Sequence, residues 1–131
     1  MKLAIGESHV LKINPAIKWQ DTEVDISANE VYEFAASGFW VDFYIITTAD
    51  GYRGNLLESQ ASKKRAPEFN WLALMGSLDQ NDSEYFLIGK ELRKTFTDSG
   101  RLSCFANDMK TGAFYLKNNW GKLTLSITRR S

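Results

Sequence analysis

The chain ends in a strictly alternating stretch, Leu123-Thr124-Leu125-Ser126-Ile127-Thr128, in which apolar and polar side chains take turns. A repeat of two residues is typical of a β-strand that buries one face, because successive side chains point to opposite sides of the strand. The same alternation recurs in residues 23–26, 31–36 and 102–106. These segments predict strands that each contribute one apolar face to a shared core.

Other segments extend this all-β pattern. Residues 71–78, WLALMGSL, are evenly apolar, as expected for a strand that is covered on both faces. Residues 85–88 and 92–96 are shorter strand candidates, and clusters of Ser, Asn, Asp and Gly separate the predicted strands. Short strands at this spacing, without a helical period, predict a sandwich or a jelly roll.

Length and charge limit the class of protein. A chain of 131 residues suits one domain, which we expect to span residues 1–131. Lys and Arg total 16, as do Asp and Glu, so we expect no nucleic-acid partner. We interpret the short basic run Lys63-Lys64-Arg65 as a solvated loop. No run approaches the roughly 20 apolar residues of a membrane span.

Cysteine content and the N-terminus suggest a compartment. Cys104 is the only cysteine, so the chain has no internal disulfide, and its place in an alternating segment predicts a buried thiol. The first ten residues, MKLAIGESHV, turn polar at Gly6, which leaves too short an apolar run for a secretory signal. We expect a cytoplasmic protein at synthesis, and extracellular delivery by an unconventional route stays open.

The four tryptophans differ in their surroundings. Trp19, Trp40 and Trp71 lie inside apolar patterns, and aromatic side chains are a main filling of small β cores. We therefore expect these three in the core. Trp120 directly follows an Asn pair, so it is expected to cover the preceding loop or to face a ligand.

Residues 106–121 carry the main candidate site. Asp108 lies at one end of a loop between two predicted strands, and Asn118 and Asn119 lie at the other end. Carboxylate and amide oxygens suit Ca²⁺, which takes roughly 6–8 oxygen ligands. The stretch contains no His or Cys, which argues against a zinc site. Because Asn, Asp and Gly are also common in turns, an ordinary turn is the alternative interpretation.

Three blocks of sequence together resemble one known family. The first is Trp19-Gln20-Asp21-Thr22 with EVYEFAASGFW at 30–40, and the second is NWLALMGSL at 70–78. The third runs from Asn107-Asp108 through Asn118-Asn119-Trp120-Gly121 to the final strand, LTLSI. In this order the blocks resemble the LecA-like family, the small bacterial calcium-dependent galactose-binding lectins and their relatives. Asp50-Gly51-Tyr52 further resembles one branch of that family.

This resemblance implies a fold and a ligand set. The fold would be a jelly-roll-type β-sandwich, galactose-binding-domain-like, with calcium at one end and sugar hydroxyls completing the metal's coordination shell. Asp108, Asn118 and Asn119 would ligate calcium through their side chains, with main-chain carbonyls from Asp42 and from Tyr115 or its neighbour. Sugar contacts would come from Asp108, Asn118, Trp120 and Gln60. Gln60 lies where those lectins carry a His-Pro…Gln contact.

Two functional hypotheses remain from the sequence. The first is a calcium-dependent, lectin-like protein that binds carbohydrate, galactose-type sugars included, as a homo-oligomer whose weak sites act together. The second is a metal-free β-sandwich for protein interaction or assembly. We do not expect an enzyme, because no pair of carboxyl groups is singled out for glycoside hydrolysis and the only histidine, His9, lies near the N-terminus.

Overall fold

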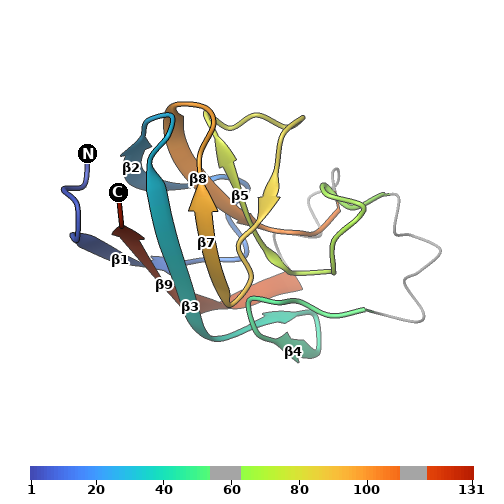
Figure 1. The fold of residues 1–131 in the computed structure, drawn as a ribbon. Coiled ribbons are helices and arrows are strands. Elements are labelled where there is room, and N and C mark those ends of the chain that lie inside the picture. Colours follow the sequence, from blue (N-terminus) through green and yellow to red (C-terminus); the bar gives the residue numbers. More distant parts are fainter. Residues whose placement is uncertain (54–62, 110–117) are drawn as a thin grey trace.

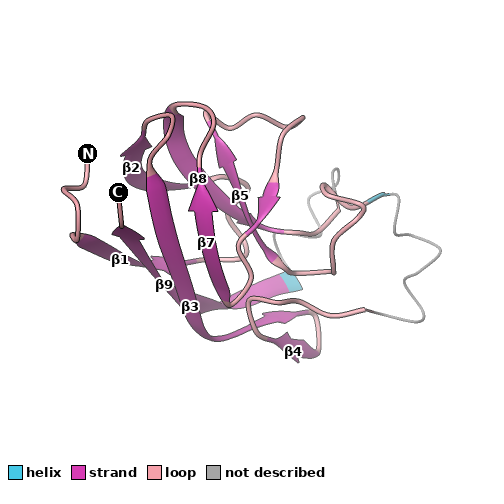
Figure 2. Ribbon diagram, viewed as in Figure 1, coloured by secondary structure: helices cyan, strands magenta, loops and turns pink. Residues whose placement is uncertain are grey.

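The computed structural model describes residues 1–53, 63–109 and 118–131, and within these ranges its strands form two antiparallel sheets (Figures 1 and 2). The first sheet has the order β1 (Ser8–Ile13), β9 (Asn119–Arg129), β3 (Val31–Asp42) and β4 (Ile45–Thr47), and β7 (Glu91–Thr95) also pairs with β3. The second sheet has the order β2 (Gln20–Ile26), β8 (Gly100–Ala106), β5 (Leu74–Leu78) and β6 (Phe86–Leu87). The predicted all-β sandwich is confirmed.

The pairing of β3 with β9 forms the centre of the first sheet. It is antiparallel and runs from Tyr32 opposite Arg129 to Asp42 opposite Asn119. On the other edge of β3, β7 pairs with its first half and β4 with its last three residues. The end of β3 and the start of β9 therefore meet at the same end of the sandwich.

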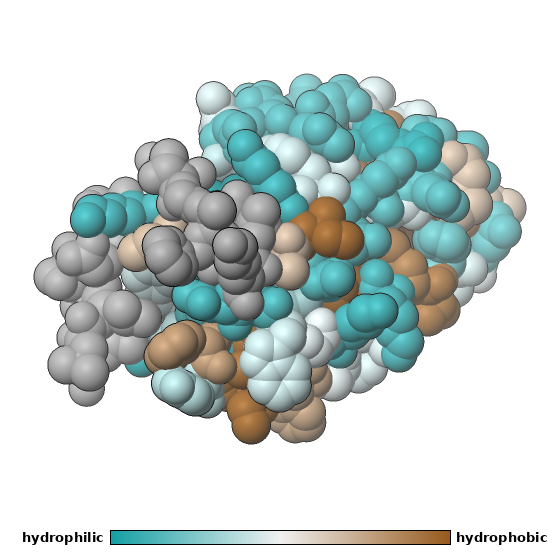
Figure 3. Space-filling model, turned by 180° about the vertical axis from the view of Figure 1, so that it is seen from behind, coloured by the Kyte–Doolittle hydropathy of each residue, from teal (hydrophilic) through white to brown (hydrophobic). Residues whose placement is uncertain are grey.

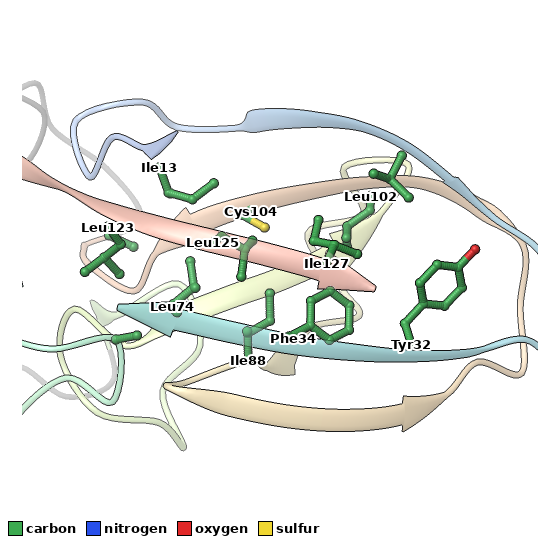
Figure 4. Close-up of a cluster of buried hydrophobic side chains, with 14 of the residues drawn as sticks. Ile13, Tyr32, Phe34, Leu74, Ile88, Leu102, Cys104, Leu123, Leu125 and Ile127 are labelled. Atoms are coloured by element: carbon green, nitrogen blue, oxygen red, sulfur yellow. The ribbon is translucent and has the colours of Figure 1, made fainter. Parts of the chain in front are cut away.

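The core lies between the sheets, and alternation explains which side chains enter it (Figure 4). Leu123, Leu125 and Ile127 of β9 are fully buried, as their spacing predicts, and face Leu102 and Cys104 of β8 in one cluster. Apolar burial of this kind is worth roughly 1.5–3 kcal/mol for each large side chain. Cys104 is buried, as predicted, and its burial raises the pKa of the thiol.

The tryptophans largely follow the prediction. Trp40 and Trp71 are buried. Trp19 is half-buried, and its ring packs edge-on against Phe105 with centroids 5.2 Å apart. Trp120 is 61% exposed, since it lies on the face of β9 opposite to the buried Asn119.

The structure corrects one sequence interpretation. Lys64 and Arg65 are not in a solvated loop, because only 7% and 4% of their surfaces are exposed. The Arg65 guanidinium lies 3.6 Å from the centroid of Phe105 and 4.5 Å from that of Trp19. A cation over aromatic faces loses less on burial than an isolated one. Charge counting along the sequence cannot detect this packing.

The sequence analysis did not predict β1 or the three-residue strand β4. Strand β5 begins at Leu74, three residues after the start of the apolar run at 71–78. Trp71 instead forms an isolated bridge with Tyr52. No helix within the described ranges is long and apolar enough to cross a bilayer.

Candidate functional site

Two strand ends bring Asp42 and Asn119 together. Asp42 is the last residue of β3, Asn119 is the first of β9, and the two are register partners. A tight turn at Phe43 and Tyr44 leads from β3 into β4. The Phe43 amide donates to the Asn118 carbonyl at 2.8 Å, and Phe43 has a φ of 57°, which bulky residues rarely adopt. Backbone contacts therefore fix this corner of the first sheet.

Asn107 fixes the facing corner, which belongs to the second sheet. Its Nδ2 donates to the carbonyls of Ala66, Phe69 and Asn70, and its Oδ1 accepts from the Ala66 amide at 2.9 Å. The side chain is fully buried and ties the 66–70 segment to the end of β8. Asp108 follows directly, so its position is set by this network.

The side chains of Asp108 and Asn119 each form one hydrogen bond with a backbone group of the described residues. Asp108 Oδ1 accepts from the Met109 amide at 2.8 Å, and Asn119 Nδ2 donates to the Pro15 carbonyl at 3.1 Å. Asp108 Oδ2 and Asn119 Oδ1 are buried and have no hydrogen-bond partner within the described ranges. A buried oxygen without a partner costs roughly 1–3 kcal/mol. Two such oxygens in neighbouring side chains fit the oxygen-rich site that a hard cation needs.

A second carboxylate lies beside this pair. The Tyr52 hydroxyl donates to Asp42 Oδ2 at 2.6 Å, and burial raises the pKa of Asp42. Burial and the charge of Asp42 raise the pKa of Asp108 to about 6, although the Met109 amide and the Asn119 side chain lower it. Burial and the Asp42 carboxylate also raise the pKa of Tyr52. The charge of Asp42 thus acts on Asp108, and each carboxylate disfavours the ionised form of the other.

A glycine allows Tyr52 to reach Asp42. Gly51 has a φ of +71°, and a Cβ there would lie 2.3 Å from the Trp71 carbonyl oxygen. Only glycine permits this approach, since any side chain would collide with backbone. Tyr52 and Trp71 then exchange two backbone hydrogen bonds of 2.9 Å, which hold the phenol in place.

The structure brings together Asp42, Asp108 and Asn119. Asn118 is half-buried with its carbonyl bonded to Phe43, and Trp120 is exposed on the outer face. Tyr115 and Gln60 lie outside the described residues. Asp42 was expected to contribute its main-chain carbonyl, and the charge of its carboxylate also raises the pKa of Asp108. No group of three or more His, Cys, Asp or Glu in the described ranges is arranged as a metal site.

Sequence reasoning assigned no role to Tyr52 or to the Asn107 side chain. For Tyr52 the only sequence signal was the Asp50-Gly51-Tyr52 resemblance, and nothing in it indicated a hydrogen bond to Asp42. For Asn107 the signal was its place before Asp108, but its four hydrogen bonds reach residues about 40 positions away.

One of the comparisons with known proteins supports the fold. Among solved structures, the chain is similar to one described as the EclA N-terminal domain, a PllA-like lectin. The TM-score is 0.67 at 19% sequence identity, over 92% of this chain and 94% of that chain. No family model matches the chain, and no curated protein matches it significantly. The fold is therefore that of a lectin-like β-sandwich.

Proposed function

We propose that this protein is a calcium-dependent carbohydrate-binding protein of the lectin type. The observation that carries the proposal is a pair of buried oxygens, on Asp108 and Asn119, that no described residue hydrogen-bonds, at the strand end where Asp42 is the register partner of Asn119. A corner built only for stability would satisfy these oxygens with protein donors. The lectin-like fold agrees with the proposal.

The residues of this corner would hold calcium through oxygen atoms only. Asp108 and Asn119 would bind through their free side-chain oxygens, and Asn118 would add its side chain from the same strand end. Bound calcium would polarise two adjacent sugar hydroxyls that complete its coordination shell. Trp120 and Gln60 remain proposed as sugar contacts, and galactose-type sugars are the first to test.

Calorimetric titration of the EDTA-treated protein with Ca²⁺, followed by a glycan array with and without Ca²⁺, tests this function. We expect calcium binding at millimolar concentration or tighter, and glycan signals that EDTA abolishes. Asp98→Asn is the matched control for Asp108→Asn. Asp98 is an exposed acid in the turn before β8, whereas Asp108 follows the opposite end of that strand. Absence of calcium binding by the wild type would refute the proposal.

The same protein is proposed to self-associate through its exposed β4 edge. Phe43, Tyr44 and Ile46 are large, exposed hydrophobic side chains, and Figure 3 shows hydrophobic side chains gathered at the lower end of that view. Residues 43–49 contain no charge, although edge strands are commonly protected by charged residues. A second copy covering this patch would place several weak sugar sites on one particle. Light scattering that shows only monomers at all concentrations would contradict this.

The exposed β4 edge also supports an alternative to the lectin function, namely a metal-free module for protein interaction. The two functions differ in the effect of EDTA, because a cation that binds only the folded protein raises the melting temperature by mass action. An unchanged melting temperature on adding calcium, together with self-association, would favour the alternative.

A further inference from the structure

We infer that the Asp42 carboxylate is a second anionic ligand of the cation, and that the Tyr52 hydroxyl positions it. This inference rests on the proposed function and adds a ligand group that the sequence did not indicate. The sequence resemblance assigned Asp42 a main-chain contact and gave Tyr52 no role.

The first argument is the placement of the Asp42 side chain. Inner-facing residues of β3 alternate, so Asp42 points to the same side as Trp40, toward the interior between the sheets. Asn119, its register partner, is also buried. The charge of Asp42 raises the pKa of Asp108, which follows strand β8 of the opposite sheet. The three side chains therefore converge from two sheets on one corner.

The second argument is that the two carboxylate oxygens of Asp42 differ in their hydrogen bonding. Oδ2 accepts the 2.6 Å hydrogen bond from Tyr52, and no described residue donates a hydrogen bond to Oδ1. A tyrosine hydroxyl on one oxygen fixes the rotation of the carboxylate and leaves the other oxygen available. Hydrogen bonds of this kind to metal ligands typically change affinity by roughly 10–100-fold when removed.

The third argument is charge. Asp42 and Asp108 both lie in a largely buried corner, and neither has a Lys or Arg ion-pair partner within the described ranges. Lys64 and Arg65, which are close along the backbone, direct their side chains to the Phe69 and Lys18 carbonyls. A divalent cation would balance two carboxylates, and the number of charged ligands is a main determinant of calcium affinity. Two acids predict tighter binding than Asp108 alone.

The test measures calcium affinity of the full chain by calorimetry after EDTA treatment. The variants are Asp42→Asn, Tyr52→Phe, the double variant and the Asp98→Asn control, each checked for folding by circular dichroism. We expect Asp42→Asn to weaken calcium binding by roughly 10-fold or more, and Tyr52→Phe to weaken it less. In the Asp42→Asn background, Tyr52→Phe should have no further effect, because coupled residues are not additive.

The outcomes separate this inference from the proposed function. If the wild type binds calcium and Asp42→Asn binds within twofold of it, the inference is overturned and the proposed function stands. If Tyr52→Phe weakens binding equally in both backgrounds, its role is structural and the positioning role is overturned. If Asp42→Asn does not fold, Tyr52→Phe decides alone, and unchanged affinity overturns the inference. If the wild type binds no calcium, both proposals are wrong.

Discussion

Replacing Asp108 by Asn should stabilise the metal-free protein at neutral pH, although it removes the principal proposed calcium ligand. The pKa of Asp108 is raised from its ordinary 3.8 to about 6, first by burial and then by the charge of Asp42. At roughly 1.4 kcal/mol for each pKa unit, holding this carboxylate ionised costs the folded state about 3 kcal/mol. Asparagine keeps the shape of the side chain and carries no charge.

The sign of the pH dependence follows from the direction of the shift. An acid with a raised pKa binds its proton more tightly in the folded state than in the unfolded state. The folded state is therefore favoured when Asp108 is protonated, and this contribution is lost as the pH rises from about 4 to about 6. Asp21, Asp25, Glu30 and Glu33 have lowered pKa values and change stability in the opposite direction. Only the difference between wild type and variant isolates Asp108.

Urea unfolding of both proteins in EDTA, from pH 4 to pH 7.5, measures this difference. The stability advantage of Asp108→Asn should grow by up to about 3 kcal/mol across that range, with most of the change between pH 4 and 6. Calcium at about 100 times its dissociation constant should nearly cancel this advantage, because such a ligand adds about 2.7 kcal/mol to the wild type alone. Asp98→Asn should show neither effect. A variant that is less stable than wild type at pH 7.5, with no pH-dependent difference, would refute this reasoning.

Three other substitutions test the surroundings of the site. Asn107→Ala removes the four hydrogen bonds of a fully buried side chain, so we expect a loss of roughly 3 kcal/mol or more in urea unfolding. Gly121→Ala adds a Cβ 3.1 Å from the Trp40 Cα at a φ of +87°, and should lower the stability by roughly 1–3 kcal/mol. Ile46→Lys places a charge on the β4 edge, and light scattering should then show a shift toward monomer, with calcium affinity unchanged.

The fold class could be predicted from the sequence because a strand with one buried face alternates apolar and polar residues. The alternation of Leu123, Leu125 and Ile127 was visible without any knowledge of their neighbours, and all three are buried. The strand β4 was missed because its residues, Ile45–Thr47, show no alternation and are held by pairing with the end of β3. A three-residue edge strand forms because it pairs with its neighbour, so the hydrophobic pattern of its own residues cannot predict it.

The site was only partly predictable for a similar reason. Asp108 and Asn119 stood out as candidate oxygen ligands at the ends of one loop, and in the structure the Asn119 side chain is close enough to lower the pKa of Asp108. Whether a polar side chain is left without a partner depends on every other donor in the fold. Tertiary packing leaves one oxygen each of Asp108 and Asn119 without a hydrogen bond from a described residue, and it brings the Tyr52 hydroxyl to Asp42. Their neighbours lie tens of residues away in the sequence.

The location of the corner would link calcium binding, as proposed, to the stability of the whole sandwich. Asp42 and Asn119 belong to β3 and β9 of the first sheet, whereas Asp108 follows β8 of the second (Figure 1). A cation held by all three would join the sheets at an end where two like charges otherwise push them apart. Binding energy at such a site contributes directly to folding energy. We therefore expect calcium to raise thermal stability and to prepare the sugar site, and a single calcium dissociation constant should account for both effects.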